Sequence, residues 1–432
     1  MNKYFKKIKE AVNWSLYVLF LKLVSLRKSK NKHDVNTTLI KDYSLMQHDD
    51  VFWFFCSTIG ELNACAPFIN RKYMNGKVVI LTDRIFYKSS YLDKFPDSLV
   101  VEVNSDDNQI SSLLKILVPN DFYVCEIPCS PNDAPCRLPY EILREIKNKK
   151  VNMFIINGWL YENEPACIQD KVERYLFRTQ YFDIFDGIAV QTNEIKRRMV
   201  EIGADSKKIE VTGNMKFDAI NNLATTAHDA ISNSLIATLM KHNNVIVAGC
   251  LIDEDEYRKV TKAFVDVLIG TPDAVYVLVP RHPEKNEQLE IITKILSEYG
   301  MSYIFKSSIL KITDFNHQVL ILDTIGELRN FYECGSICYV GKDHNVLEPL
   351  FLGKKVVVPD GWNKKYPSYP VFDIARENGL LAIDSEDSLG VLFSEQLRNN
   401  IDKSNEVKTC LQKLSGATIR NDSFINKLTC GV

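Results

Sequence analysis

The chain has 432 residues, which is long for one ordinary domain and predicts two or three. Hydrophobic residues make up 46% and charged residues 25%, and the formal net charge is −2, so the composition excludes a disordered chain and a generally basic nucleic-acid-binding protein. The 11 cysteines form no CxxC pair and we find no sequence that resembles a cleavable signal peptide, so we expect reduced thiols in a cytoplasmic protein and no zinc site.

The N-terminal residues 1–32 differ sharply from the rest in charge. They carry nine Lys or Arg and one acid, a net charge of +8, so the remainder carries −10. Within them, residues 11–26 are mostly apolar but are interrupted by Asn13 and Lys22, and they fall short of the roughly 20 residues needed to cross a bilayer. We therefore predict an amphipathic helix on an anionic membrane surface, with packing against the protein's own core as the alternative. Residues 33–50 predict a polar linker.

A strand followed by a tight turn opens the main part of the chain. The run Val51–Cys56 is rich in Val, Phe and Trp, Ser57–Gly60 is a turn of small residues, and Glu61 starts a segment with helical spacing. Parallel sheets bind ligands at the carboxyl ends of their strands, where the unpaired N–H groups of a helix also lie. Glu61 is therefore a candidate catalytic residue, or alternatively only an acidic residue that complements the helix dipole.

Short β-rich runs alternate with helical segments through the rest of the chain, which predicts parallel sheets covered on both faces. Leu138–Asn148 and Asn193–Ile202, for example, have helical spacing, and the polar passage Asn221–Asn244 is the predicted hinge. The predicted regions are an anchor and linker over 1–45 and two domains over 46–222 and 223–432. The predicted strands are Val51–Cys56, Lys77–Thr82, Leu99–Val103, Phe122–Cys125, Val151–Ile156, Gly187–Gln191, Ile209–Thr212, Val245–Gly249, Val275–Pro280, Ser302–Phe305, Val319–Leu322, Ile337–Gly341 and Lys355–Pro359.

Two turns in the second half can bind anions. Arg281 and His282 directly follow a predicted strand, and an arginine fork can bind a phosphate through two hydrogen bonds. The N–H groups around Gly326 and Glu327 can hold a phosphate or a carboxylate without a side-chain charge. The alternatives are a surface turn with an incidental arginine and an ordinary helix cap.

A third turn, before the predicted strand Lys355–Pro359, ends in an acid. His344 and Asn345 precede a helix start, and Glu348 lies in its first turn, where a carboxylate can bind ribose hydroxyls. A structural helix start is the alternative. The D-x-D spacing of Asp253 and Asp255 is more simply an acidic helix start than a metal site.

Taken in order, these motifs resemble those of the 3-deoxy-D-manno-octulosonic acid (Kdo) transferases of glycosyltransferase family 30. The resemblance implies an α/β protein of the GT-B fold, with two Rossmann-like parallel-sheet domains facing across a cleft and an N-terminal membrane-anchoring helix. It implies that the first domain binds the acceptor and the second binds a CMP-sugar. The similar segments are Ser57–Glu61, Val211–Asp218, Pro280–Glu284, Asp323–Leu328 and His344–Pro349.

The resemblance implies an inverting enzyme that transfers Kdo, or a related 2-keto sugar acid, from CMP-Kdo to a lipid A precursor or another cell-envelope glycan, without a cofactor or metal ion. It places the enzyme on the cytoplasmic face of the bacterial inner membrane, bound through residues 1–32, with no nucleic-acid partner. Glu61 is the implied catalytic base, and Glu126 assists it or positions the acceptor. The implied donor-binding residues are Lys216, Arg281, His282, Gly326, Glu327, His344, Asn345 and Glu348.

The chain also departs from that family. Val124–Cys129 keeps an acid and a proline of the usual Thr-Glu-Leu-Trp-Pro segment but lacks its Trp, the glycine-rich run before His344 is cut to Gly341–Asp343, and Val346 replaces the usual Pro. Donor-side motifs are thus better kept than acceptor-side motifs. The alternatives are a UDP-sugar GT-B transferase or sugar-nucleotide 2-epimerase, and a catalytically inactive GT-B protein at a membrane surface.

Overall fold

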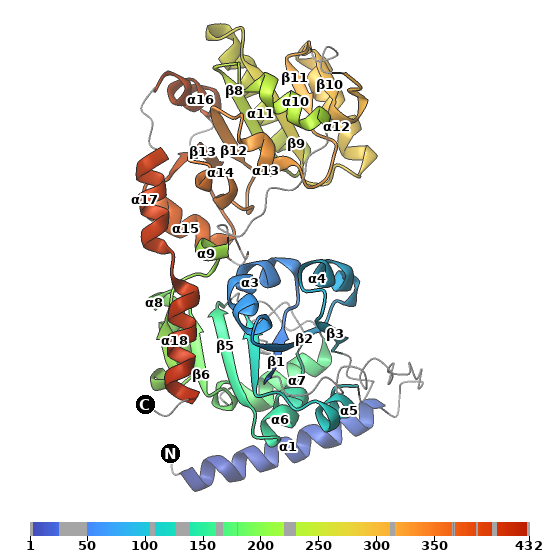
Figure 1. Cartoon of the computed structure of the whole chain (residues 1–432), viewed down its shortest axis with the longest axis vertical. Coiled ribbons are helices and arrows are strands. Elements are labelled where there is room, and N and C mark those ends of the chain that lie inside the picture. The colour runs from blue at the N-terminus through green and yellow to red at the C-terminus, as the bar shows by residue number, and fades with distance from the viewer. Residues whose placement is uncertain are drawn as a thin grey trace. The chain divides into compact units, whose positions relative to one another are not determined.

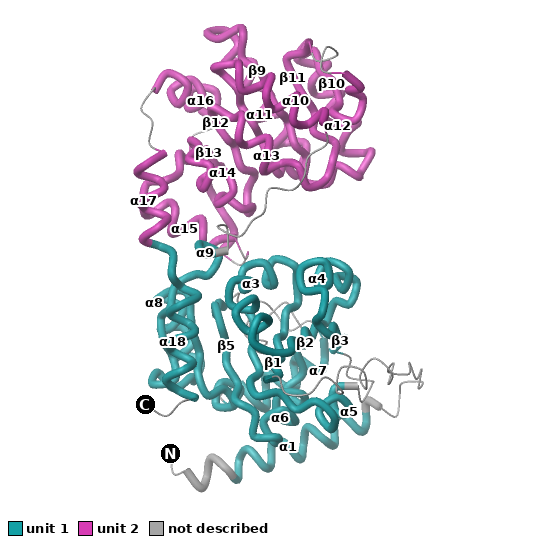
Figure 2. The backbone as a smooth tube through the Cα atoms, viewed as in Figure 1, with its two compact units in different colours: residues 1–222, 414–432 teal, residues 223–413 magenta. Residues whose placement is uncertain are grey.

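The chain folds into two compact units, shown in a computed structural model (Figures 1 and 2). The first comprises residues 1–222 and 414–432, and the second residues 223–413. Each is built on a parallel sheet of seven strands, so the predicted class of two Rossmann-like α/β domains is confirmed. The structure describes residues 3–25, 50–103, 109–126, 138–160, 167–178, 180–219, 230–311, 316–364, 366, 368–385, 388–399 and 404–429.

The sheet of the first unit has the strand order β3-β2-β1-β4-β5-β6-β7. Strand β1 lies between β2 and β4, with Phe54 opposite Ile80 on one side and Tyr123 on the other. Its residues from Val51 onward are all buried, because helices cover both faces and leave no polar side for the strand. The strands are β1 Asp50–Phe55, β2 Gly76–Thr82, β3 Leu99–Glu102, β4 Asp121–Cys125, β5 Asn152–Gly158, β6 Gly187–Val190 and β7 Ile209–Val211.

Helices of the first unit come from both ends of the chain. Helices α3 and α18 pack against each other and against β5, and the aromatic rings of Phe54, Phe68, Tyr123 and Phe154 stack in the core beneath them. The helices are α1 Lys3–Ser25, α3 Ile59–Tyr73, α4 Lys88–Lys94, α5 Gln109–Ile116, α6 Tyr140–Asn148, α7 Ile168–Phe177, α8 Asn193–Glu201, α9 Lys216–Ala219 and α18 Ala417–Thr429.

The C-terminal helix α18 belongs to the first unit, which differs from the predicted second domain of residues 223–432. The carboxylate of Asp218 accepts hydrogen bonds from the N–H groups of Gly416 (2.5 Å) and Thr418 (2.6 Å) at the start of that helix. The guanidinium of Arg420 donates to the carbonyl oxygen of Thr212 (2.7 Å). These contacts join the end of the chain to the segment that leaves the first sheet.

The sheet of the second unit has the strand order β10-β11-β9-β8-β12-β13-β14. Its last strand, β14, was not predicted, although Leu381–Ile383 are apolar; only Asp384 of this strand is fully buried. The strands are β8 Val245–Leu251, β9 Val275–Pro280, β10 Tyr303–Phe305, β11 Val319–Ile321, β12 Ile337–Val340, β13 Lys355–Pro359 and β14 Leu381–Asp384.

Part of the predicted hinge is helical. Residues 221–229 lie outside the described residues, but Ala230–Leu239 forms helix α10, with Leu235 and Leu239 buried. Polar Asn and Ser residues hid this apolar face in the sequence. The other helices of the second unit are α11 Glu254–Gly270, α12 Asn286–Glu298, α13 Leu328–Tyr332, α14 Leu347–Phe351, α15 Tyr369–Glu377, α16 Leu389–Arg398 and α17 Ser404–Leu414.

One face of helix α1 packs on the first unit. The buried hydroxyl of Tyr17 donates to the carboxylate of Glu173 on α7, and the amide of Asn13 donates to the carbonyl oxygen of Leu176 (2.6 Å). None of the helices in the described ranges has the length and hydrophobicity needed to span a bilayer. Of the predicted linker at residues 33–50, all but Asp50 lies outside the described residues. An opposite face of α1 exposes an apolar stripe, in which each side chain is 46% to 57% exposed: Ile8, Val12, Leu16, Leu19 and Leu23.

Candidate functional site

Glu61 lies at the carboxyl end of β1, in the first turn of α3. The hydroxyl oxygen of Thr58 accepts a hydrogen bond from the N–H of Glu61 (3.3 Å), and the carboxylate of Glu61 accepts from the N–H of Ser57 (2.7 Å) and the hydroxyl of Thr58 (3.1 Å). This reciprocal arrangement resembles a capping box, except that the backbone N–H bound by the carboxylate is that of Ser57, one residue before the N-cap Thr58. Glu61 therefore has the helix-start geometry that we gave as the alternative interpretation, and it lies at the strand end where ligands bind.

The surroundings of Glu61 change its acidity. Its side chain is buried, and this burial, together with the nearby charge of Glu126, raises its pKa to about 8. The hydrogen bonds from Ser57 and Thr58 oppose the rise because they stabilise the charged form. A carboxyl with this pKa can both accept and release a proton near neutral pH.

Glu126 lies one residue beyond the end of β4, in a left-handed backbone conformation with φ of 59° that is uncommon for a residue with a side chain. The strand ladder holds it there, because its N–H donates to the carbonyl oxygen of Ile156 (2.8 Å) and its carbonyl oxygen accepts from the N–H of Trp159 (2.8 Å). One carboxylate oxygen accepts a hydrogen bond from the ammonium of Lys216 (2.6 Å). The other, Oε2, is buried and has no hydrogen-bond partner among the described residues.

A network of buried amides fixes Lys216. The side chain of Gln191 donates to the carbonyl oxygen of Asn157 (2.9 Å) and accepts from the amide of Asn214 (2.8 Å). The amide oxygen of Asn214 accepts from the N–H of Lys216 (2.9 Å), and that of Asn157 accepts from the N–H of Met215 (2.8 Å). Asn157 and Gln191 were missed in the sequence. Asn157 directly follows the predicted strand Val151–Ile156, and Gln191 ends the predicted strand Gly187–Gln191. A polar side chain at the end of an apolar strand could have indicated both residues.

In the second unit, the turns after β9 and β12 bring cations and an acid together. Burial, together with the charges of Arg281 and His282, lowers the pKa of His344 to about 4. Burial raises the pKa of Glu348, while a hydrogen bond from the amide of Asn345 (3.3 Å) and the charge of Arg281 oppose that rise. The sequence-predicted donor residues of these two turns are therefore neighbours.

Two further residues belong to this cluster and were missed in the sequence. Cys250 follows Gly249 near the end of β8, with φ of 62°, and its thiol interacts with Arg281. Burial raises the pKa of that thiol to about 11, so it is neutral at ordinary pH. Arg329, on the short helix α13, acts on the charge of Glu348. Two features of the sequence could have indicated these residues. Cys250 stands where Gly249 interrupts an apolar strand, and Arg329 is a cation directly after the turn that contains Gly326.

The turn that contains Gly326 and Glu327 is held by its own contacts. Gly326 has φ of +88° and open space around the position of a Cβ atom. Burial opposes ionisation of Glu327, but hydrogen bonds from Ser232, Thr324 and Lys306 lower its pKa. The described contacts of Glu327 thus hold the turn and do not join it to Arg281.

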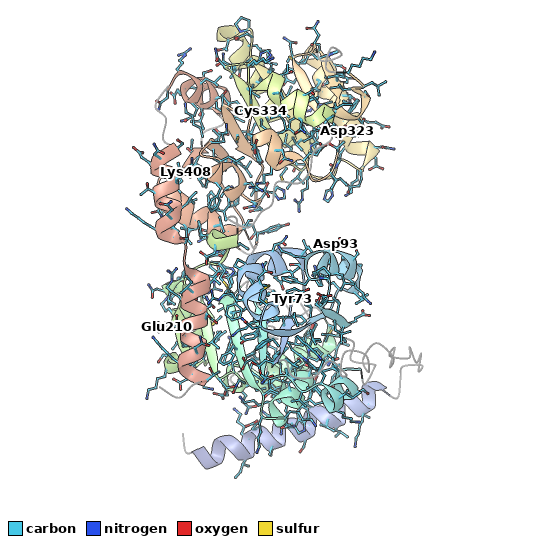
Figure 3. All side chains as sticks on the ribbon, viewed as in Figure 1. Tyr73, Asp93, Glu210, Asp323, Cys334 and Lys408 are labelled. Atoms are coloured by element: carbon cyan, nitrogen blue, oxygen red, sulfur yellow. The ribbon has the colours of Figure 1, made fainter. Side chains whose placement is uncertain are left out.

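Asp323, at the start of the same motif and labelled in Figure 3, also has a local role. Its carboxylate accepts hydrogen bonds from the N–H (2.9 Å) and the hydroxyl of Ser307. Within the described residues, no group of three or more His, Cys, Asp or Glu side chains is arranged to hold a metal ion. Asp253, from the D-x-D spacing, caps α11 and accepts from the N–H of Glu256 (3.0 Å).

Comparisons with known proteins agree with this architecture. The family model for 3-deoxy-D-manno-octulosonic-acid transferase (kdotransferase) matches residues 136–219, which include Lys216 and the amide network. The chain is 28% identical to the 3-deoxy-D-manno-octulosonic acid transferase of Chlamydia trachomatis over 69% of this chain and 67% of that protein. It is 24% identical to a bifunctional glycosyltransferase/methyltransferase of Fusobacterium nucleatum, over 81% of this chain but only 52% of that longer protein.

Among solved structures, a UDP-N-acetylglucosamine 2-epimerase of Listeria monocytogenes, described as putative in its own name, matches 89% of this chain and 98% of its own, with a TM-score of 0.60 and 13% identity. This likeness concerns the fold alone. The two Rossmann-like units, each on a seven-stranded parallel sheet, give the chain a GT-B-like fold. The family-model match and the 28% identity to relatives named Kdo transferases support the resemblance to the Kdo transferase family that the motifs predicted.

Proposed function

We propose that this protein transfers Kdo, or a related 2-keto sugar acid, from a CMP-activated donor to a lipid A precursor or another cell-envelope glycan. The observation that supports this most is Glu61, an ionisable carboxyl at the end of β1 in a chain similar to proteins named Kdo transferases. A hydroxyl acceptor needs a base at the moment of attack, and a group with a pKa of about 8 is suited to that task.

In the proposed reaction, Glu61 removes the proton of the acceptor hydroxyl while the oxygen attacks the anomeric carbon of the sugar. The bond to the CMP phosphate breaks on the opposite face, so the configuration inverts. Glu61 is only 2% exposed, and one of its oxygens is engaged by the N–H of Ser57. Acceptor binding therefore requires the side chain or the turn at Ser57 and Thr58 to move and admit the hydroxyl.

Glu126 and Lys216 prepare this carboxyl. The charge of Glu126 raises the pKa of Glu61, and the ammonium of Lys216 holds Glu126 in place through a 2.6 Å ion pair. The unpartnered oxygen of Glu126 is free to accept a hydrogen bond from the acceptor. In this proposal Glu126 positions the acceptor, and Lys216 acts chiefly through Glu126.

The cluster of the second unit receives the donor in this proposal. Arg281 binds the phosphate, and Glu348 binds the ribose hydroxyls, with Asn345 orienting its carboxylate. His282 lies in the turn after β9, and His344, neutral because its pKa is about 4, lies in the turn after β12. Gly326 leaves open space for N–H groups to approach the phosphate. Charge that develops on the departing phosphate is stabilised by these fixed donors, so the reaction needs no metal ion.

Helix α1 brings the enzyme to an anionic membrane, which we place at the cytoplasmic face of the inner membrane. Its inner face is held by Tyr17 and Asn13, and its outer apolar stripe is exposed. A helix of this kind inserts its apolar side at the level of the headgroups.

The proposed function is tested by incubating the full chain with radiolabelled CMP-Kdo and a lipid A precursor, with and without EDTA. We expect a labelled glycolipid and release of CMP, with the same yield when divalent ions are chelated. Absence of label in this acceptor and in whole cell-envelope extracts contradicts the transfer, and loss of transfer on chelation contradicts metal independence.

A further inference from the structure

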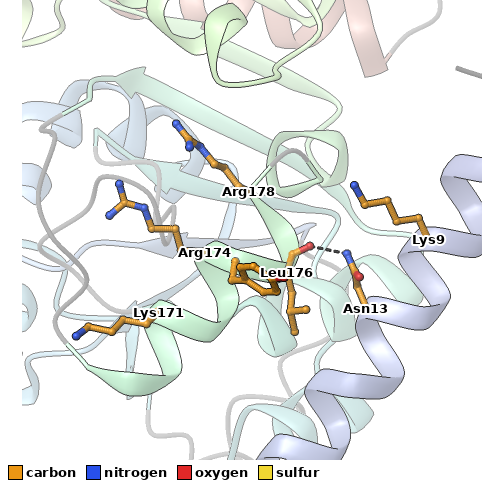
Figure 4. A pocket seen from close by; sticks show the side chains of 7 residues that line it. Lys9, Asn13, Lys171, Arg174, Leu176 and Arg178 are labelled. Carbon is orange, nitrogen blue, oxygen red and sulfur yellow. Dashed lines mark hydrogen bonds between the residues drawn. The ribbon is translucent and has the colours of Figure 1, made fainter.

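A cavity of about 630 Å³ lies within the first unit, between α1 and α7 (Figure 4). Its lining combines four cations with polar and apolar groups, and no carboxylate is among the lining residues. None of these residues belongs to the sites described above. The lining residues are Lys9 and Asn13 from α1, and Lys171, Arg174, Tyr175, Leu176 and Arg178 from α7 and its C-cap.

The acids of α7 do not line this cavity. The carboxylate of Glu173 is buried and turned toward the protein, where it accepts hydrogen bonds from the hydroxyl of Tyr17, the N–H of Tyr140 (3.3 Å) and the amide of Gln169 (3.3 Å). Glu173 therefore directs its charge away from the cavity, and the charged residues of α7 and its C-cap that line the cavity are cations. The hydrogen bond from the amide of Asn13 to the carbonyl oxygen of Leu176 joins the two helices, and Figure 4 shows it as a dashed line.

The cavity adjoins the exposed apolar stripe of α1. At about 100° per residue, Lys9 lies roughly 60° around the helix from the middle of the stripe, between it and the face that packs on α7. In Figure 4 the side chain of Lys9 extends from α1 toward the α7 side. Tyr175, at 88% exposure, and Ile168, at 71%, add exposed apolar surface from α7.

We propose that this cavity binds the phosphate group of a lipid headgroup in the membrane that the apolar stripe enters. The inference rests on the membrane contact proposed above and adds a specific ligand class to it. Four cations without a lining acid match the charge of a phosphate, and arginine forks match its geometry. The volume exceeds that of a bare phosphate and admits the rest of a headgroup, and an exposed tyrosine is suited to the membrane interface.

The test measures binding of the full chain to vesicles of phosphatidylcholine alone and of phosphatidylcholine mixed with phosphatidic acid. The cavity variant is Lys171→Ala/Arg178→Ala, in which both replaced side chains are exposed. The matched control is Lys88→Ala/Lys94→Ala, which removes two exposed cations from α4, on a different part of the same unit (Figure 1). Thermal melting of each variant checks that it folds.

We expect the wild type and the control to bind the vesicles that contain phosphatidic acid more tightly than those of phosphatidylcholine alone. The cavity variant should bind the phosphatidic acid vesicles roughly tenfold or more weakly than the wild type does. Its binding to phosphatidylcholine vesicles should equal that of the wild type. An undiminished preference in the cavity variant, or an equal loss in the control, overturns the inference. Stabilisation of the wild type by inorganic phosphate, without any effect of the cavity variant on vesicle binding, overturns it in favour of free phosphate. Failure of the wild type to bind either vesicle instead refutes the membrane contact itself.

Discussion

At the scale of single residues, the proposed role of Glu61 as the base makes the rate of transfer depend on pH. Because a base must be ionised, and the pKa of Glu61 is raised to about 8 by burial and by Glu126, we expect kcat to rise roughly tenfold per pH unit up to about pH 8 and then to level off. Glu126→Gln removes the nearby negative charge, so the rise of kcat with pH should occur at lower pH in this variant. The measurement is a pH–rate profile of both proteins. If kcat rises over the same pH range in both, the charge of Glu126 does not raise the pKa of Glu61.

The same carboxyl makes stability depend on pH. Its pKa in the folded state lies above its ordinary value of 4.5, so the folded protein holds a proton that the unfolded chain releases. Stability relative to a Glu61→Gln variant is therefore greatest below about pH 4.5 and falls as pH rises toward 8, on the order of 1.4 kcal/mol per unit. Urea unfolding of both proteins at several pH values measures this difference. A difference that stays constant with pH contradicts the raised pKa.

Arg281 makes a separate prediction about the donor. Arg281→Ala removes the proposed partner of the phosphate and should weaken CMP binding by about 2 kcal/mol, roughly thirtyfold in Kd. Calorimetry with CMP measures the change. Arg258→Ala is the control, because the guanidinium of Arg258 already pairs with Glu254 (2.7 Å) and Glu298 (2.5 Å) in the same unit. Equal affinities in the two variants remove Arg281 from the phosphate site.

At the scale of elements, Asp218 joins the last helix to the first unit. Asp218→Ala leaves the N–H groups of Gly416 and Thr418 without their carboxylate cap and should cost about 1–2 kcal/mol of stability. Faster hydrogen exchange in residues 417–429 is the specific readout. Glu210→Ala on strand β7, an exposed acid labelled in Figure 3, is the control and should leave that exchange unchanged. Unaltered exchange in the Asp218 variant contradicts the anchoring role.

The elements also show what the sequence could and could not predict. Buried strands such as β1 and β9 were predicted because a parallel strand covered on both faces is a continuous apolar run. The short β14 was missed although three of its four residues are apolar; those three are only partly buried in the structure. The return of α18 to the first unit depends on contacts between residues some 200 positions apart in the chain, such as Asp218 with Thr418, and helical periodicity does not report on such pairs.

Residues of the candidate site were predicted only where they belong to a recognisable sequence motif. Glu61, Arg281 and Glu348 stand at strand ends in recognisable motifs, and their roles remain predictions. Asn157 and Gln191 carry no motif, since they matter through their hydrogen bonds to residues brought near by the sheet order.

At the scale of the whole molecule, helix α1 serves both the fold and the proposed membrane contact. The ring of Tyr17 on this helix lies edge-on to the ring of Phe177, with 5.3 Å between the ring centroids. The guanidinium of Arg144 lies over the ring of Trp14, 4.3 Å from its centroid. Deleting residues 1–32 should release the enzyme from anionic vesicles, but it also uncovers this aromatic core. A loss of binding after deletion therefore has two explanations.

The double variant Leu16→Asp/Leu19→Asp separates the two. Both side chains point away from the packed face, each more than half exposed, so the thermal melting temperature should change little. Placing two charges in the apolar stripe should nevertheless abolish vesicle binding, because a charged group must be dehydrated to enter the acyl region. Vesicle sedimentation of this variant beside Ser15→Asp, a single exposed change on the same helix, measures the effect. Retained binding in the double variant shows that the stripe does not enter the membrane, and the proposed lipid acceptor must then be reached by another surface.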